Sequence, residues 1–559
     1  MIKNKKKNNK VKKTDTLVTV ESISPAKTVE LRIGIIGSNS SYFKETHQMF
    51  LKLIQEQLIA RGVHPVFIGI SGGSDGFLEK PSFVSDGISQ PVKQEPQSML
   101  AHYGLPTRDM IADQIEWIAH EEHLNGWIML PWSISSLVGM MMATVRCGVP
   151  TVFAPFYSAW SHFSILNEAH PTHKKEFYYS SFSLPVLLEV FGLALMGSFF
   201  KTFQYNKNST AAALKTTAST ESLLLNELQK DTQDFISWNT QRILDLVRQN
   251  ITPKRFFSQA AFQNAIYVDR ALGHSTETVL HLNAIAYEAG VPLSLAYYNE
   301  SIKKLTIMAD LNSSGELSLE HFVQEGGIQA LLHSMHHSLH PSPTISGKNL
   351  VEIAKETSGT KSTLVKIPDL IDKNKVPPGM VVLSGNLSRE GSLFRAIGVK
   401  EHWLSHMGPV KVFRSEKDAV LSIETKKIKK GDVIVLSYCG PRGSPGMPAL
   451  QTLQYSLEHH KLDGEVMVLT DGRILSPGKI PCITHIAPEA AVGSTLSILQ
   501  DGDVVAWNYQ EQTLMARLTE TEIKVRLSRW KEQIRDPKNT FLNRYSKYSS
   551  SSAYGAILI

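Results

Sequence analysis

Short apolar runs alternate with helical patterns over residues 31–153, and this alternation constrains the fold more than any other feature. The apolar runs, which are five or six residues long and typical of buried strands, are residues 31–36, 66–70, 126–130 and 149–153. Stretches with apolar residues at helical spacing include residues 45–60, 108–123 and 137–146. Strands joined through helices run parallel, because only a crossover returns the chain to the same end of a sheet. The sequence therefore predicts a parallel sheet with helices on both faces and with the loops after Ile36, Ile70 and Leu130 converging at one edge.

From about residue 375 the pattern changes to short strand-like runs separated by Gly, Asp and Asn turns. These runs are residues 380–383, 410–413, 433–436, 466–469 and 504–507. The fold class predicted for the whole chain is therefore α/β, with a parallel-sheet domain followed by a β-rich domain. We expect a disordered Lys/Asn-rich tail at residues 1–30, an N-terminal α/β domain at 31–355, a C-terminal β-rich domain at 356–559 and a hinge near residues 341–346.

The charge distribution argues against a nucleic-acid-binding protein. The formal net charge is +6, but residues 1–13 hold seven lysines and no acidic residue. The remaining chain is therefore close to neutral, and we expect the basic stretch to be a solvated extension.

Two further features of the sequence bear on location. The apolar run at residues 184–200 includes Glu189 and is too short and too polar to span a bilayer, so we expect a buried core helix and no membrane contact. Cys147, Cys439 and Cys482 lie far apart without a CxxC pair, which excludes a disulfide framework and favours a reducing compartment, the cytoplasm.

The stretch from residue 431 to residue 491 holds the clearest candidate for a site. Two strand-like runs, residues 433–436 and 466–469, each lead into a loop rich in Gly and Pro, residues 440–448 and 471–481. Residues 450–460 between them form a helical pattern. Gly-rich loops at the ends of neighbouring strands bring backbone amides close to a ligand, so this pattern predicts a small-molecule pocket.

These loops carry motifs that identify a family. Residues 440–448 read GPRGSPGMP, residues 469–473 read LTDGR and residues 485–490 read HIAPEA. In this order and spacing they resemble the dihydroxy-acid dehydratase and phosphogluconate dehydratase family. Weaker matches to the same family extend the resemblance to nearly everything after Leu31; they are residues 84–88, 105–113, 271–282 and 384–387. The resemblance implies that the second domain is a swivelling, barrel-like one.

The resemblance also implies a chemistry. Such enzymes remove water from a 2,3-dihydroxy acid through an iron–sulfur cluster held by three cysteines, which acts as a Lewis acid on the 3-hydroxyl. A magnesium ion held by an Asp, a Glu and a modified Lys binds the carboxylate end, and a serine acts as the base. Hydroxide is a poor leaving group and the C2 proton is weakly acidic, so the reaction depends on this neutralisation of charge.

At the positions implied for the cluster, this chain has other residues. The three cysteine positions fall at or near Glu45, at Ser133 and near Lys175. A carboxylate, a hydroxyl and an ammonium group are not soft sulfur ligands for iron. We therefore expect no iron–sulfur cluster, and we expect Cys147, Cys439 and Cys482 to be ordinary thiols.

The implied magnesium site and base are changed as well. Ile134 replaces an acidic residue of the family, Ser135 replaces its metal-binding lysine and Ala449 replaces a glutamate. Asp86 alone survives as a weak candidate metal ligand. The base position reads Leu475, with Ser476 one place later as the candidate catalytic residue. We expect no magnesium cofactor in this chain.

The remaining candidate ligand-binding groups are those suited to an anion. They are the Arg473 guanidinium, Asp86 and the backbone amides of Gly443 and Gly446. The ligand class that they favour is a small carboxylic or sugar acid.

Two functional hypotheses follow. The first is a degenerate, inactive member of the family that keeps the fold and the dimer and whose remaining role is binding, with an acid as the favoured ligand, or assembly. A sensor for a small acid is a variant of this hypothesis with the same fold and a specific ligand. The second is an active hydro-lyase that dehydrates a 2,3-dihydroxy acid or a sugar acid at a rebuilt site, using Asp86, Ser476, Arg473 and either Glu45 or Glu277. Under both hypotheses we expect a homodimer whose interface includes the apolar residues 184–200.

Overall fold

A four-stranded parallel sheet forms the centre of the N-terminal part of the chain. The computed structural model describes residues 31–38, 44–72, 99–155, 183–199, 218–305, 307–309, 319–356, 379–475, 479–532 and 540–559. The sheet has the order β2-β1-β3-β4, with β1 at Arg32–Ser38, β2 at His64–Ile70, β3 at Gly126–Met129 and β4 at Thr151–Phe153. All neighbouring pairs are parallel, as the alternating pattern predicts.

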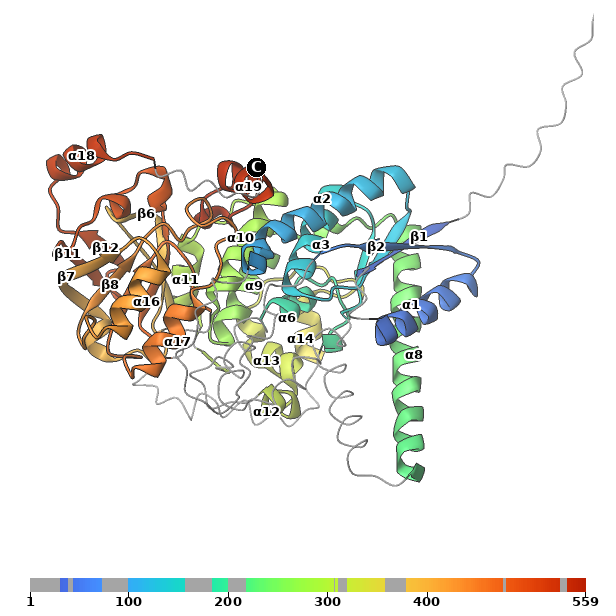
Figure 1. The fold of residues 1–559 in the computed structure, drawn as a ribbon. Helices are drawn as coiled ribbons and strands as arrows, with labels where there is room; N and C mark the ends of the chain where they lie inside the picture. The colour runs from blue at the N-terminus through green and yellow to red at the C-terminus, as the bar shows by residue number, and fades with distance from the viewer. Residues whose placement is uncertain are drawn as a thin grey trace, which may run out of the picture.

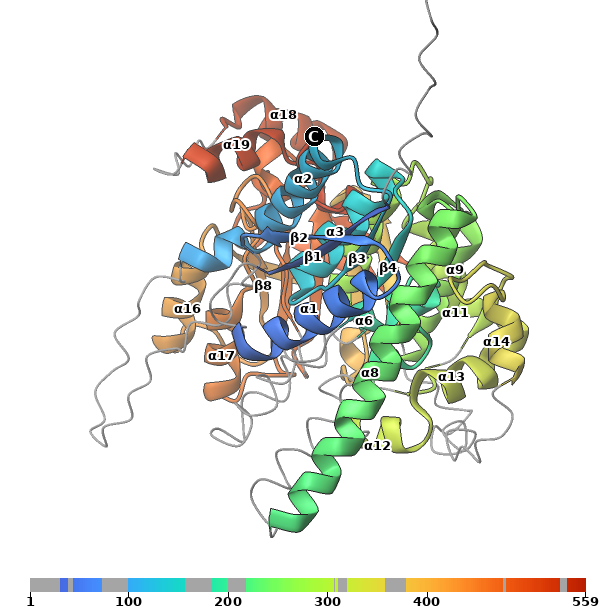
Figure 2. The ribbon, with the colours of Figure 1, turned by 90° about the vertical axis from the view of Figure 1, so that its right-hand side faces the viewer.

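Helices cover both faces of this sheet (Figures 1 and 2). Helix α1 (Lys44–Ile59) packs with the long helix α8 (Ala218–Arg248) on one face, and α2 (Gly104–Glu122) packs with α3 (Ile134–Cys147) on the other. Helices α2 and α3 approach closely because Gly139 has no side chain: a Cβ there would lie 2.5 Å from the carbonyl oxygen of Arg108. With the sheet buried on both sides, β1 is almost wholly inaccessible to solvent.

A second helical layer completes the N-terminal part. Its members are α6 (Ser183–Val190), α9 (Gln259–Ala271), α10 (Thr276–Glu288), α11 (Ala296–Lys304), α12 (Leu319–Gln324), α13 (Gly327–Met335) and α14 (Leu350–Glu356). None of the helices in the described ranges is long and apolar enough to cross a membrane.

The apolar run at residues 184–200 is a core element through residue 194, whereas residues 195–197 are half-buried, and its predicted role in a dimer stays a prediction. Its helix, α6, is only eight residues long and packs against α9 and α3. Leu184, Leu187 and Phe191 are at most 1% exposed in the single chain. Because these side chains are already buried inside one chain, they are not available to a second copy.

The C-terminal part is a closed eight-stranded barrel, shown in yellow to red in Figure 1. The strand order is β10-β6-β5-β12-β11-β7-β8-β9. The strands are β5 (Met380–Gly385), β6 (Ser388–Arg395), β7 (Ser405–Phe413), β8 (Val433–Leu436), β9 (Met467–Thr470), β10 (Cys482–Ala487), β11 (Val504–Asn508) and β12 (Thr513–Ala516). Helices α16 (Glu416–Glu424), α17 (Gln451–His459) and α18 (Glu520–Arg529) lie outside it. The predicted combination of a parallel α/β part and a barrel-like β part is thus confirmed.

The segment predicted as a hinge, residues 341–346, makes backbone hydrogen bonds with neighbouring parts of the N-terminal domain, and its role as a hinge stays a prediction. The Ile345 amide donates to the Gly192 carbonyl at 2.8 Å, and the Leu350 amide donates to the Ser342 carbonyl at 2.8 Å. Ser342 and Ile345 are both buried. The segment is therefore fixed to the N-terminal helices. The predicted tail at residues 1–30 lies outside the described residues.

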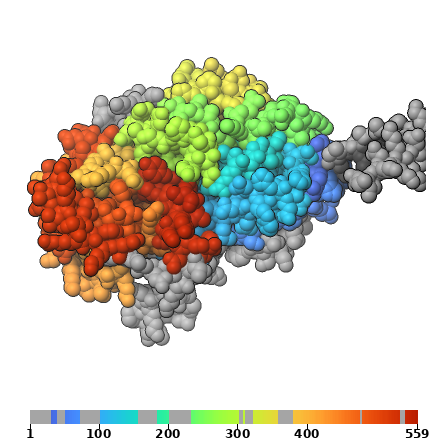
Figure 3. Space-filling view, turned by 90° about the horizontal axis from the view of Figure 1, so that it is seen from above, coloured from blue at the N-terminus to red at the C-terminus, as the bar shows by residue number. Residues whose placement is uncertain are grey.

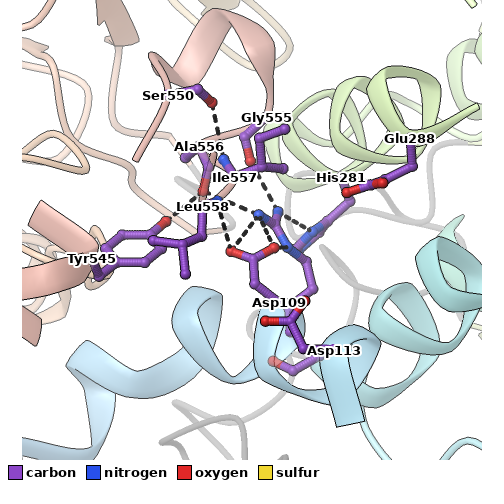
Figure 4. A network of polar contacts seen from close by, with 12 residues as sticks. Asp109, Asp113, His281, Glu288, Tyr545, Ser550, Gly555, Ala556, Ile557 and Leu558 are labelled. Atoms are coloured by element: carbon purple, nitrogen blue, oxygen red, sulfur yellow. Dashed lines mark hydrogen bonds and ion pairs between the residues drawn. The ribbon is translucent and has the colours of Figure 1, made fainter. Parts of the chain in front are cut away.

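The end of the chain joins the two parts. After α19 (Thr540–Tyr548) the last residues run back over α2, and Figure 3 shows these red residues lying against the blue and green ones. Two adjacent buried residues of α2 hold them: Arg108 donates to the carbonyls of Gly555 and Ala556 at 3.0 Å each, and Asp109 accepts from the Leu558 amide at 3.3 Å (Figure 4). We call these contacts the tail clasp. They connect helix α2, which covers one face of the sheet, with the last residues of the chain.

The tail clasp should contribute strongly to stability. Replacing Arg108 by Met should lower the free energy of unfolding by about 3–5 kcal/mol, because Asp109 then stays buried without its guanidinium partner. Urea denaturation followed by circular dichroism measures this. Arg108→Met/Asp109→Leu should recover part of the loss, and Arg529→Met, at an exposed position of α18, should have little effect. A loss below about 1 kcal/mol for Arg108→Met would contradict the role given to the clasp.

Candidate functional site

The loops that follow β8 and β9 are held together by the carboxyl group of Asp471. Its oxygens accept hydrogen bonds from the backbone amides of Cys439 at 2.8 Å, Ala490 at 2.9 Å and Tyr438 at 3.1 Å. One side chain thereby fixes the end of β8, the turn after β9 and the segment after β10. The LTDGR motif therefore has a structural function at its aspartate.

A second buried carboxyl group, from the segment after β10, contacts the Gly-rich loop. Glu489 accepts from the amide of Arg442 at 3.0 Å and from the amide of Gly443 at 2.9 Å. The Gly443 amide is therefore already engaged by a side chain of the same protein. Its predicted role in binding an external acid stays a prediction.

Gly446 lies where the loop meets the segment before α2. Its φ is +81°, and a Cβ at this position would lie 1.8 Å from the carbonyl oxygen of His102. The neighbouring carbonyl of Pro445 contacts Nδ1 of His102 at 2.8 Å. Gly446 thus permits the barrel loop to touch the N-terminal part. Its predicted role in ligand binding stays a prediction.

Arg473, the strongest candidate for acid binding, already binds a carboxylate. Its Nη1 donates to Oε2 of Glu277 at 2.6 Å, and its Nε donates to the carbonyl of Met447 at 2.5 Å. Arg473 is 4% exposed and Glu277 is 6% exposed. Glu277 lies in the first turn of α10, where the helix dipole favours a negative charge. The ion pair crosses from the barrel to the N-terminal helices.

Two buried histidines surround this ion pair. His281 follows Glu277 by one turn of α10, with Nε2 3.8 Å from Oε2 of Glu277 and Nδ1 3.5 Å from Nη1 of Arg108. His485 comes from β10, and its Nε2 is buried without a hydrogen-bond partner in the described part of the chain. Burial, and next the nearby Arg473 charge, lower the pKa of His485 to about 3. Burial together with Arg108 and Arg473 lowers the pKa of His281 well below its usual value. Both rings are therefore neutral at physiological pH.

The loop after β3 uses its polar side chains within the fold. Ser133 caps α3 by accepting from the Ser136 amide at 3.0 Å, and Ser136 Oγ accepts from the Ser133 amide at 2.8 Å. Ser135 Oγ donates to the carbonyl of Gly104 at 3.0 Å. This reciprocal cap and the bond to α2 explain the two serines as structural residues.

The described residues do not fit an iron–sulfur cluster or a magnesium site. At two of the implied ligand positions the chain has the buried hydroxyls of Ser133 and Ser135. At a third position it has Ala449, whose side chain is a methyl group and whose backbone forms a β-bridge with Arg473. Burial raises the pKa of Cys482 to about 12, so its thiol stays protonated. Nowhere in the described ranges do three or more His, Cys, Asp or Glu residues form a group able to hold a metal ion.

Several predicted site residues cannot be placed. Asp86, Lys175 and Ser476 lie outside the described residues, and Glu45 is in α1 with its side chain outside them. Leu475, at the implied base position, is buried. Of the rebuilt site, the structure brings together Arg473 and Glu277. His281 was not among the predicted site residues, although its position four residues after Glu277 in a predicted helix places the two side chains on the same face.

Comparison with known proteins places the chain in a family. The family described as Dihydroxy-acid/6-phosphogluconate dehydratase N-terminal matches residues 48–158 and 174–353, and the C-terminal one matches residues 368–556. Dihydroxy-acid dehydratase of Citrifermentans bemidjiense is 32% identical over 521 residues, covering 90% of each chain. Dihydroxy-acid dehydratase of Thermodesulfovibrio yellowstonii is 31% identical over 524 residues, again covering 90% of each. The chain belongs to the dihydroxy-acid/6-phosphogluconate dehydratase family.

The buried carboxyl groups of the loops make stability depend on pH. Burial raises the pKa of Glu489 to about 8, with Asp471 adding to the shift. A folded-state pKa above the unfolded one stabilises the fold below about pH 4.5, and this contribution is lost as pH rises toward 8. Unfolding free energy should therefore fall by on the order of 1 kcal/mol per pH unit across this window through Glu489 alone.

The matched variants isolate this group. Glu489→Gln should reduce the fall in stability between pH 5 and 8 by on the order of 1 kcal/mol per pH unit, measured by urea denaturation in a series of buffers. The rest of the slope should persist, because other buried carboxyl groups such as Asp471 also have raised pKa values. Glu511→Gln, at an exposed position, should keep the wild-type slope. An unchanged slope in folded Glu489→Gln would show that Glu489 does not titrate in this range.

Proposed function

We propose that this chain is a family member that no longer eliminates water and that binds a small hydroxy acid or sugar acid without converting it. The observation that carries the proposal is the loop after β3. Ser133 and Ser135 are engaged in a helix cap and in a bond to Gly104, where the family resemblance implies a cluster thiolate and a magnesium-binding lysine.

The chemistry of elimination supports this conclusion. Loss of hydroxide from a hydroxy acid needs a strong Lewis acid at the leaving oxygen and positive charge near the carboxylate. A neutral hydroxyl and a methyl group supply neither. Compensating for one replaced ligand is feasible, whereas replacement of several ligands in separate loops removes the whole electrostatic arrangement.

The acid ligand is the part of the function that the family relationship favours. The relatives are named for a dihydroxy acid. In this chain, Arg473 is held rigidly by the Met447 carbonyl and binds a carboxylate oxygen at 2.6 Å. A guanidinium in this setting is suited to an acid.

Anaerobic purification tests the loss of the reaction. The full chain should be colourless, with iron and acid-labile sulfide well below one per chain, because its loops lack the thiolates that a cluster needs. It should turn over neither 2,3-dihydroxyisovalerate nor gluconate, assayed by formation of the 2-keto acid. The relative from Citrifermentans bemidjiense, assayed in parallel on the dihydroxy acid, is the control for turnover.

Two results would overturn this proposal. Brown protein with stoichiometric iron would show that the loops hold a cluster after all. Turnover by colourless protein would establish the alternative, an active hydro-lyase with a rebuilt site. The contact between Arg473 and Glu277 is the observation that favours that alternative, because it places two of its proposed residues together. In that case Arg473→Gln should abolish turnover.

We further infer that the chain is a homodimer in the cytoplasm. The dimer rests on the family relationship, and the cytoplasm rests on three cysteines that form no disulfide, all of which the structure describes. Light scattering at micromolar concentration should give twice the chain mass. Since Leu187 is buried within one chain, Leu187→Ala should destabilise the fold without selectively producing monomers. A monomeric wild-type protein would refute the dimer.

A further inference from the structure

We propose that Glu277 is a built-in competitor for the acid-binding position on Arg473, so that the chain closes its own ligand site. An external acid binds when its carboxylate displaces the Glu277 side chain. This inference rests on the proposed acid-binding function and adds its regulation.

The geometry of the ion pair carries the argument. The Nε–H of Arg473 is fixed by the Met447 carbonyl, which leaves the Nη side of the guanidinium for a carboxylate. Glu277 places Oε2 there at 2.6 Å, the contact that a bound acid would make. With this pair formed, the net charge at the position is zero, and the attraction for an anionic ligand is lost.

Two groups beside the ion pair are suited to contacts with a hydroxy acid. Arg473 follows β9 at the rim of the Gly-rich loops, and its guanidinium points toward the start of α2, where a Cβ on Gly104 would lie 3.8 Å from Nη2. His485 is next to this position, since its amide donates to the carbonyl of Gly472 at 3.0 Å. Its buried Nε2, unpartnered within the described residues, is suited to a ligand hydroxyl.

The pair also joins the two parts of the chain. Glu277 comes from α10 in the N-terminal part and Arg473 comes from the barrel. Exchange of Glu277 for a ligand carboxylate therefore changes an interdomain contact. Since Glu277 is held within the same chain, its effective concentration at Arg473 is high, and an external acid competes at a disadvantage.

Removing the competitor tests the proposal. Glu277→Gln keeps the size of the side chain and removes its charge. By isothermal titration calorimetry with gluconate and 2,3-dihydroxyisovalerate, this variant should bind at least one acid about tenfold or more tightly than wild type. Glu277→Gln/Arg473→Gln should lose this gain. Glu288→Gln, which removes another ion-paired carboxylate of α10, should bind like wild type.

Acetate separates a ligand site from a purely structural ion pair. If Glu277 only fills a space of its own size, Glu277→Gln gains affinity for acetate but not for the larger acids, and the proposal is overturned. It is also overturned if folded Glu277→Gln binds no acid more tightly, or if the double variant keeps the gain. Should Glu277→Gln not fold, Glu277→Asp, which withdraws the carboxylate by one methylene, must show a smaller gain in the same direction.

The two proposals fail separately. Iron and turnover in the wild-type protein would refute the proposal that the family reaction is lost, whatever the affinity of the Glu277→Gln variant. If the wild-type protein is colourless and converts no acid, and the Glu277→Gln variant gains no affinity, only the proposal that Glu277 competes at Arg473 is refuted.

Discussion

The loops of this protein depend on buried carboxyl groups that accept hydrogen bonds from backbone amides. Asp471, which follows β9, accepts from two amides after β8 and from one after β10, and Glu489 accepts from two amides of the Gly-rich loop. Such loops contain few side chains that pack, so their conformation relies on these polar contacts. Without them, neither the approach of Gly446 to His102 nor the position of Arg473 would be fixed.

Two buried arginines then connect the barrel and the α/β part. Arg108 reaches from α2 to the end of the chain, and Arg473 reaches from the barrel to α10. His281 lies between them, within 3.8 Å of Glu277 and 3.5 Å of Arg108. A change of charge at Glu277 therefore acts on the interface of the two parts, which is why this residue is a suitable point of control.

The family features of this chain divide into those that build the fold and those that perform the reaction. The residues retained in the motifs, such as Asp471, Glu489 and Gly446, make contacts that hold the loops of this chain in place. The replaced positions, Ser133, Ser135 and Ala449, are the ones at which the family resemblance implies cluster or metal ligands. Their replacements are well accommodated, since Ser133 caps a helix and Ser135 bonds to Gly104.

The sequence by itself determined the parallel sheet, its covering helices and the β-rich nature of the second part, because hydrophobic periodicity is a local property. Strands β6 and β12 were not predicted, because the segments SREGSLFR and TLMA have no long apolar run and become strands only through pairing in the closed barrel. The sequence also predicted Arg473 and the amides of the Gly-rich loop as anion-binding groups. Only the tertiary structure decided that Glu277 and Glu489 already bind to them, since Glu277 is 196 residues from Arg473 and Glu489 is 46 residues from Gly443. Contacts over such distances depend on how the two parts pack, which no local pattern of residues records.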